Sequence, residues 1–111
     1  MNGPIKTRSF TDDFGTAGIS ETFEFNQNWK LVNIMFHFSA ATTETITVEI
    51  IDSALGANFD TVLTTISPSA ATDSFNHYGA DYIFPATSKL KITSTNSGAT
   101  LSYGQVMIEE V

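Results

Sequence analysis

The chain has 111 residues, a formal net charge of −7 and no cysteine. This length is that of one domain of ordinary size, and the lack of cysteine excludes a disulfide framework, a thiol nucleophile and a cysteine-ligated zinc ion. The excess of carboxylates repels phosphate backbones and anionic lipid headgroups, so we expect neither nucleic acid nor a membrane as a partner.

Hydroxyl groups carry most of the polarity of the sequence. Charged residues make up only 15% of the chain, whereas sixteen Thr and eleven Ser are present. Thr and the aromatic residues, which include nine Phe, suit the pleated, half-buried surfaces of strands better than they suit helices. The composition therefore predicts an all-β protein and argues against disorder and coiled coil.

Segments in which apolar and polar residues alternate follow one another along the chain. They predict strands over residues 21–27, 29–39, 43–51, 59–66, 81–84, 89–95 and 100–110, the last with a bulge at Gly104. The side chains predicted to face the core are Phe23, Phe25, Val32, Ile34, Phe36, Phe38, Ile46, Val48, Ile50, Leu90 and Ile92. Residues 69–80 lack a period, and we expect a long loop there with one short strand near Phe75.

Seven or eight short strands separated by turn residues predict a single antiparallel two-sheet β-sandwich of the jelly-roll type. We expect the sandwich domain to cover residues 21–111. Residues 1–20 lack a period and are rich in Gly and Asp, so we expect an irregular N-terminal arm or rim segment there.

The second face of segment 29–39 mixes apolar and polar side chains, among them Leu31, Met35 and His37. This face would expose more apolar surface than a solitary domain tolerates. We therefore predict that these three residues contact either the chain's own arm or a neighbouring subunit of a cyclic trimer.

The motifs of catalysis and cofactor binding are missing from the sequence. It has no G-x-S-x-G elbow, no G-x-G-x-x-G loop and no histidine pair at metal-ligand spacing. Asp12 and Asp13 match no calcium loop, and we expect them in turns or caps. We therefore predict a protein that is not an enzyme and that has no catalytic residue, cofactor or metal.

The loop expected at residues 69–80 contains four candidates for binding: Phe75, Asn76, His77 and Tyr78. Aromatic side chains stack on sugar rings and pack at protein interfaces, and amides supply hydrogen bonds. A sugar and a protein surface are both possible ligands, although loop tips of sandwiches also have this composition without binding anything. Trp29, the only tryptophan, is expected to anchor the sandwich edge rather than to hold a ligand.

Between Trp29 and Glu109 four segments follow one another: HFSAAT, TETITVEIID, ANFDTVLTTISPSAATD and DYIFPATSKLKITSTNSGATLSYGQVMI. Their order resembles that of the small β-sandwich decoration, or cement, proteins of tailed bacteriophage capsids. The resemblance implies a homotrimeric structural protein that binds the major capsid protein on the exterior of the virion and that resides in the host cytoplasm during assembly. Related sandwiches occur in tail fibres and baseplates, so a carbohydrate- or receptor-binding tail module is the alternative.

The first ten residues contain the candidates for capsid contact: Lys6, Arg8 and Phe10. Lys6 and Arg8 are a basic pair in an acidic protein, which makes them the expected partners of carboxylates on the major capsid protein. We expect the arm to carry this contact, repeated over many subunits.

Overall fold

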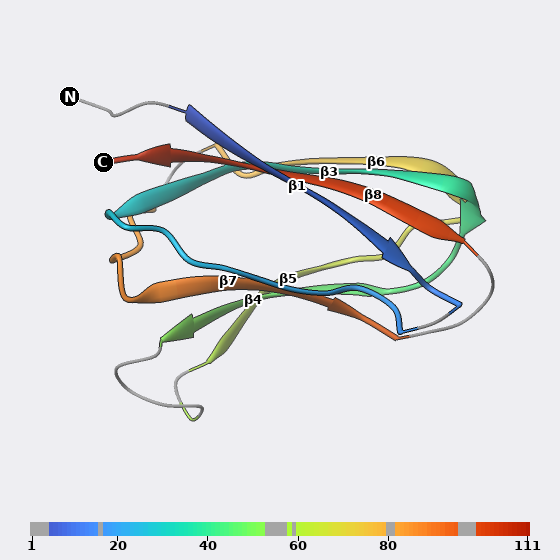
Figure 1. Cartoon of the computed structure of the whole chain (residues 1–111), viewed down its shortest axis with the longest axis horizontal. Helices are drawn as coiled ribbons and strands as arrows, with labels where there is room; N and C mark the ends of the chain where they lie inside the picture. The colour runs from blue at the N-terminus through green and yellow to red at the C-terminus, as the bar shows by residue number, and fades with distance from the viewer. Residues whose placement is uncertain (1–4, 16, 53–57, 59, 80–81, 96–99) are drawn as a thin grey trace.

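The protein is described from a computed structural model, which defines residues 5–15, 17–52, 58, 60–79, 82–95 and 100–111. Eight strands account for most of these residues (Figure 1): β1 (Ile5–Asp13), β2 (Ser20–Phe23), β3 (Trp29–Thr42), β4 (Ile46–Asp52), β5 (Thr61–Ile66), β6 (Ala71–His77), β7 (Ser88–Ser94) and β8 (Leu101–Glu110). They form two four-stranded sheets, the first in the order β1-β8-β3-β6 and the second in the order β2-β7-β4-β5. Among the described residues there is no helix that could cross a membrane.

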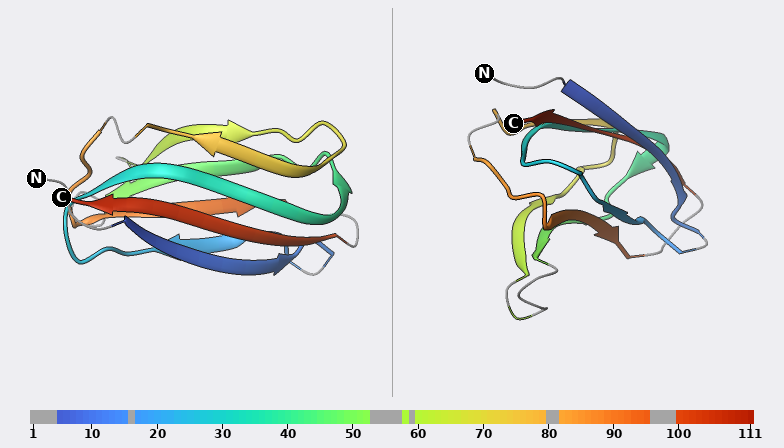
Figure 2. Two further views of the ribbon diagram at one scale, coloured as in Figure 1. Left: turned by 90° about the horizontal axis from the view of Figure 1, so that it is seen from above. Right: turned by 60° about the vertical axis from the view of Figure 1, so that its left-hand side comes forward.

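The strand pairing identifies the topology of the sandwich. Antiparallel pairs join β1 to β8, β2 to β7, β3 to β6, and β4 to β5. The chain is thus one long antiparallel ribbon whose successive pairs alternate between the two sheets. Figure 2 shows the sandwich from above, looking onto the first sheet, and turned so that the left-hand side of Figure 1 comes forward. Eight strands paired in this way form a jelly roll, so the predicted all-β sandwich is confirmed.

The core lies between the two sheets. Of the residues predicted to face inward, eight are buried: Phe25, Ile34, Phe36, Phe38, Ile46, Val48, Leu90 and Ile92. Phe23 and Ile50 are partly buried and pack against them. The remaining one, Val32, is only partly buried, because the pairing of β3 with β8 shifts by one residue between Leu31 and Asn33.

This bulge reverses the two faces at the start of β3. Leu31, predicted on the mixed outer face, is a core residue with 3% of its surface exposed. Trp29, on the same side, is completely buried between the rings of Phe25 and Phe84, whose centroids lie 4.8 and 4.7 Å away. Trp29 is therefore a central core residue rather than an edge anchor.

The segment expected to be an irregular arm contains a regular strand. β1 pairs with β8 over nine consecutive residues, from Ile5 opposite Glu109 to Asp13 opposite Leu101. Phe10 belongs to the buried core. The alternation of β1 is hidden in the sequence because this edge strand points mostly polar side chains inward, a common protection of exposed sheet edges.

Two further local expectations are corrected. Residues 69–80 were expected to be a long loop with one short strand near Phe75. A strand is present there, but it is longer than expected: residues 71–77 form the edge strand β6, which pairs with β3. Gly104 is not a bulge: it pairs in regular register with Phe10 on one side and Phe36 on the other. Its missing side chain makes room for the Phe10 ring, since a Cβ atom on Gly104 would lie 2.2 Å from that ring.

Candidate binding surfaces

The outer face of the first sheet presents regular rows of side chains that run across β1, β8, β3 and β6. The register places three rows side by side: Thr7, Met107, Asn33 and His77; Ser9, Gln105, Met35 and Phe75; Thr11, Tyr103, His37 and Asp73. Among these twelve residues only Asp73 has a carboxylate. These three rows therefore carry one carboxylate and no lysine or arginine, in a protein whose net charge is −7.

A shallow depression of about 560 Å³ lies on this face, over the middle of the sheet. Its lining comes from the strands β1, β3 and β8 and consists of Ser9, Phe10, Thr11, Met35, Phe36, His37, Tyr103, Gly104 and Gln105. The polar groups among these stand on paired strands, so their positions are fixed by the backbone ladder rather than by a loop.

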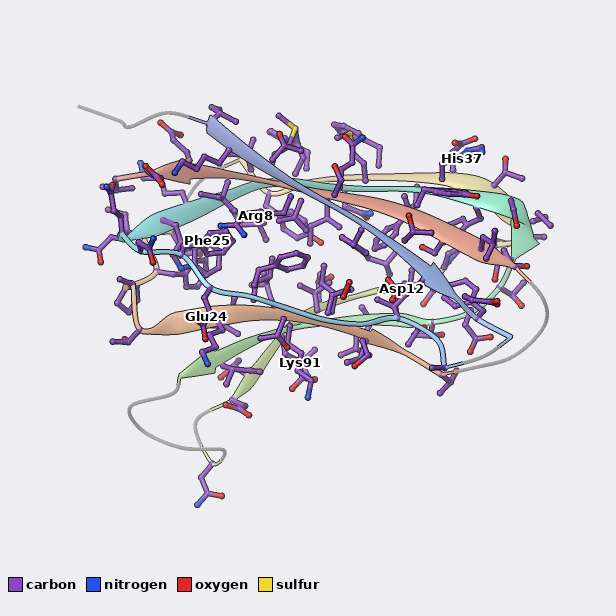
Figure 3. The ribbon with its side chains drawn as sticks, in the orientation of Figure 1. Arg8, Asp12, Glu24, Phe25, His37 and Lys91 are labelled. Atoms are coloured by element: carbon purple, nitrogen blue, oxygen red, sulfur yellow. The ribbon has the colours of Figure 1, made fainter. Side chains whose placement is uncertain are left out.

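His37 and Tyr103 stand beside each other at one end of the depression. Their ring planes differ by 27° and their centroids are 6.3 Å apart. His37 is exposed on the outer side of the sheet (Figure 3), and its Nδ1 lies 2.8 Å from Oδ1 of Asp73. The hydrogen bonds from His37 and from the Thr72 hydroxyl hold the pKa of Asp73 below its usual value.

The outer face brings together candidates that the sequence placed in separate groups. Met35 and His37 were predicted as subunit contacts, and Phe75 and His77 as loop residues, yet Met35 stands opposite Phe75 in the register. Phe75 is 65% exposed. The Nδ1 atom of His77 lies 2.7 Å from Oδ1 of Asn33.

The other two loop candidates do not belong to this outer face. Asn76 donates from Nδ2 to the backbone oxygen of Ile34 and to the Ser74 hydroxyl, at 3.4 and 2.9 Å. Tyr78 packs against the core, and its burial raises the pKa of its phenol to about 12. Phe75, Asn76, His77 and Tyr78 are therefore not one recognition loop.

A second surface lies at the edge of the sandwich formed by β5 and the segments around β6, and we call it the apolar edge. A hollow of about 80 Å³ there is lined by Leu31, Leu63, Tyr78, Tyr82 and Phe84. Tyr82 is 72% exposed, and Leu63 and the adjacent Val62 are also among the exposed large apolar residues. An apolar hollow with an exposed apolar rim is typical of a protein contact.

The backbone holds the apolar edge in place. Trp29 and Phe84 exchange two hydrogen bonds, Trp29 N to Phe84 O at 2.9 Å and Phe84 N to Trp29 O at 2.7 Å. The amide of Tyr78 donates to the oxygen of Val32 at 2.8 Å. Phe84, two residues after Tyr82, is thus tied through its backbone to the fully buried Trp29.

The opposite edge, between β1 and β2, contains the residues predicted to contact a capsid. Lys6 forms an ion pair of 2.8 Å with Glu110, whose side chain is 10% exposed. Arg8 lies over the ring of Phe25, 5.6 Å from its centroid, and Figure 3 shows the two side chains beside each other. Lys6, Arg8 and the buried Phe10 are thus engaged within the sandwich itself.

Two acidic residues, Asp12 on β1 and Glu21 on β2, lie at this same edge, which we call the charged edge. The side chain of Asp12 accepts a hydrogen bond from the backbone of Ser20, but its Oδ2 atom is buried without a partner among the described residues. Burial raises the pKa of Asp12 above its usual value, and burial together with the charge of Asp12 raises the pKa of Glu21. Asp13 instead accepts a hydrogen bond from the amide of Gly15 at 2.8 Å, which is the turn role expected for it.

Within the described part of the chain, no three His, Asp or Glu side chains are arranged to hold a metal ion.

Comparison with known proteins gives likenesses in structure but not in sequence. The sequence matches no protein family and no curated protein. The core of Drosophila NLP, studied for pentamer formation and histone binding, is 14% identical with a TM-score of 0.48, over 91% of this chain and 96% of that one. The VP2 subviral particle of infectious bursal disease virus is 14% identical with a TM-score of 0.41, over 96% of this chain and 32% of that one.

A third structural neighbour is the pair of CBM22-1 and GH10 modules of xylanase 10B from Clostridium thermocellum, solved with xylohexaose. It is 18% identical with a TM-score of 0.43, over 80% of this chain and 17% of that one. The neighbours thus include viral capsid proteins and a carbohydrate-binding module, and this chain spans about a third or less of both of those longer proteins. Each likeness concerns the β-sandwich fold alone.

Proposed function

We propose that the chain is a non-enzymatic structural protein of a tailed bacteriophage virion, a capsid decoration protein that docks on the major capsid protein through its apolar edge. The apolar edge is the observation that carries the proposal. The order of sequence features from Trp29 to Glu109, which resembles that of decoration proteins, supplies the identity of the partner.

The apolar edge is suited to a protein contact for two reasons. Tyr82 and Leu63 frame a hollow whose floor is the core residue Leu31, so a partner side chain that enters it adds to an existing core. The hydrogen bonds between Trp29 and Phe84 fix the backbone two residues from Tyr82 before docking, which reduces the backbone entropy lost on binding.

The sequence led us to expect the capsid contact on the N-terminal segment, and we propose it instead for the apolar edge. Lys6 and Arg8 interact within the sandwich, and β1 is part of the first sheet. We keep the homotrimer that the resemblance implies: three copies present three apolar edges to one three-fold position of a capsid. Contacts that are weak singly then add through multivalency.

The test is co-sedimentation of the purified chain with capsids from which the protein has been removed, taken from the virion whose genome encodes it. We expect the chain to pellet with these capsids. The variant Leu63→Ser/Tyr82→Ser should weaken attachment by at least about tenfold. Light scattering should give three times the 12.0 kDa mass of one chain.

The matched control is Ile5→Ser, which removes a side chain that is 54% exposed on β1, away from the apolar edge. Its attachment should equal that of the natural chain. If both variants bind capsids as tightly as the natural chain, the apolar edge is not the docking surface; if the natural chain ignores capsids and adheres to host envelopes, the tail module takes the place of the decoration protein.

A further inference from the structure

We infer that the depression on the outer face of the first sheet is a binding site for a neutral saccharide, with Tyr103 as the stacking ring and Ser9, Thr11 and Gln105 as hydrogen-bonding groups. The inference does not depend on the capsid role, because it concerns a different surface from the apolar edge. It rests on the geometry of the lining, on its unused polar groups and on its charge.

The lining has the composition that sugar recognition requires. The C–H faces of a sugar ring pack on aromatic rings, while its hydroxyl groups need donors and acceptors around them. Tyr103 is 44% exposed and stands at the depression beside His37. Gln105 provides an amide, and Ser9 and Thr11 provide hydroxyls from the neighbouring strand β1.

These polar groups are available to a ligand. Among the described residues, none forms a side-chain hydrogen bond with Ser9, Thr11, Gln105 or Tyr103. In the register Ser9 stands opposite Gln105, and Thr11 opposite Tyr103. The backbone ladder therefore holds these residues in two adjacent rows, so binding a ligand requires no ordering of the backbone there.

Charge selects the class of saccharide. The chain has a net charge of −7, and the carboxylate of Asp73 lies at the edge of the face, 2.8 Å from His37 Nδ1. An anionic sugar or a phosphate would be repelled by this field. A neutral sugar is not repelled. The volume of about 560 Å³ lies within the range of small-ligand sites.

The experiment is an amide NMR titration of the full ¹⁵N-labelled chain with three neutral probes, cellohexaose, maltohexaose and chitohexaose, and with one anionic probe, hexagalacturonate. We expect at least one neutral probe to shift the amide signals of Ser9, Tyr103 and Gln105, with a dissociation constant of about 1 mM or below. Hexagalacturonate should shift them less at equal concentration.

Two variants of the same outer face sharpen the test. Tyr103→Ala should weaken binding of the neutral probe by about tenfold, and Tyr103→Phe, which keeps the ring, should weaken it less. The control Phe75→Ala removes an aromatic ring that is more exposed than Tyr103, at 65% against 44%, and that does not line the depression. It should bind as the natural chain does. Retained dispersion of the amide spectrum shows that each variant is folded.

Three results would overturn the inference. One is that none of the neutral probes shifts these signals. Another is that Phe75→Ala loses binding while Tyr103→Ala retains it, which would move the contact to β6. The third is that the signals of the outer face shift with protein concentration alone, which would mean that a second copy of the chain occupies this face. None of these results bears on attachment to capsids through Leu63 and Tyr82.

Discussion

The ring of Phe10 lies across Gly104, on the inner side of the first sheet. A Cβ atom added to Gly104 would stand 2.2 Å from the Cζ atom of Phe10. The same ring packs against Phe36 of the first sheet, at a centroid distance of 5.8 Å, and against Phe23 of the second sheet, at 5.5 Å. The missing side chain of Gly104 thus lets Phe10 join both sheets at the edge of the sandwich.

This contact predicts that Gly104→Ala destabilises the fold, although alanine usually suits a strand better than glycine does. The added methyl group forces the Phe10 ring against its two aromatic neighbours, and overpacking of this kind costs about 1–3 kcal/mol. Urea denaturation measures the loss. Phe10→Leu in the Gly104→Ala background should restore part of it.

The control is Gln105→Ala, at the exposed neighbouring position, which should change the free energy of unfolding by no more than about 0.5 kcal/mol. A Gly104→Ala variant as stable as the natural chain would show that Phe10 does not occupy this space.

Deletion of residues 1–10 should prevent stable folding. It removes six of the nine pairs between β1 and β8 together with the Phe10 ring, and truncation of one buried phenylalanine alone costs about 3–5 kcal/mol. The amide NMR spectrum of the truncated chain should lose its dispersion. A dispersed spectrum close to that of the natural chain would mean that this segment is a dispensable arm after all.

The sequence predicted best those strands that turn an apolar face toward the core, and less well those that do not. The central strands β3, β4 and β7 bury alternate apolar residues such as Ile34, Val48 and Ile92, so their period is visible. The edge strand β1 points Lys6, Arg8 and Asp12 inward, and β6 places Phe75 outward, so neither has an apolar period facing the core. The bulge at Leu31 is set by tertiary pairing and leaves no mark in the sequence.

The candidate binding surfaces were less predictable than the fold. Met35 and His37 were identified from their mixed face, but the rows that join them to Tyr103 and Phe75 come from pairings between distant parts of the chain. Tyr103 could have been noticed as an aromatic residue on the polar side of the last strand. Leu63 and Tyr82 meet only because β5 and the segment after β6 lie at the same edge.

The charged edge predicts a dependence of stability on pH. The pKa of Asp12 is raised by burial, so the folded state binds protons more strongly than the unfolded state. The contribution of Asp12 to stability therefore falls as the pH rises from the ordinary carboxyl pKa, about 4, through the raised folded value, and it remains lower at neutral pH.

Asp12→Asn keeps the acceptor for Ser20 but removes the charge. We expect a higher free energy of unfolding than that of the natural chain at about pH 7, and a difference that shrinks toward zero at about pH 3. Urea denaturation over this range measures both. A variant that is less stable at neutral pH would show that the ionised form of Asp12 is the favoured one.

The hydrogen bond between His37 and Asp73 on the outer face predicts how the pKa of Asp73 responds to a substitution of His37. The hydrogen bond from His37 is the first cause of the lowered pKa of Asp73, followed by the bond from Thr72. In His37→Ala the pKa of Asp73 should rise toward its ordinary value, because the larger of the two stabilising bonds is lost. Carboxyl ¹³C NMR follows this titration, and an unchanged midpoint would exclude the pairing of His37 with Asp73 in solution.

The central claim is that the chain decorates a capsid, and a density map of the virion whose genome encodes it tests that claim most directly. We predict density for the β-sandwich at three-fold positions over the whole head, with the edge that contains Leu63 and Tyr82 facing the major capsid protein. Heads without this density, together with sandwich density only at the tail tip, would contradict the account.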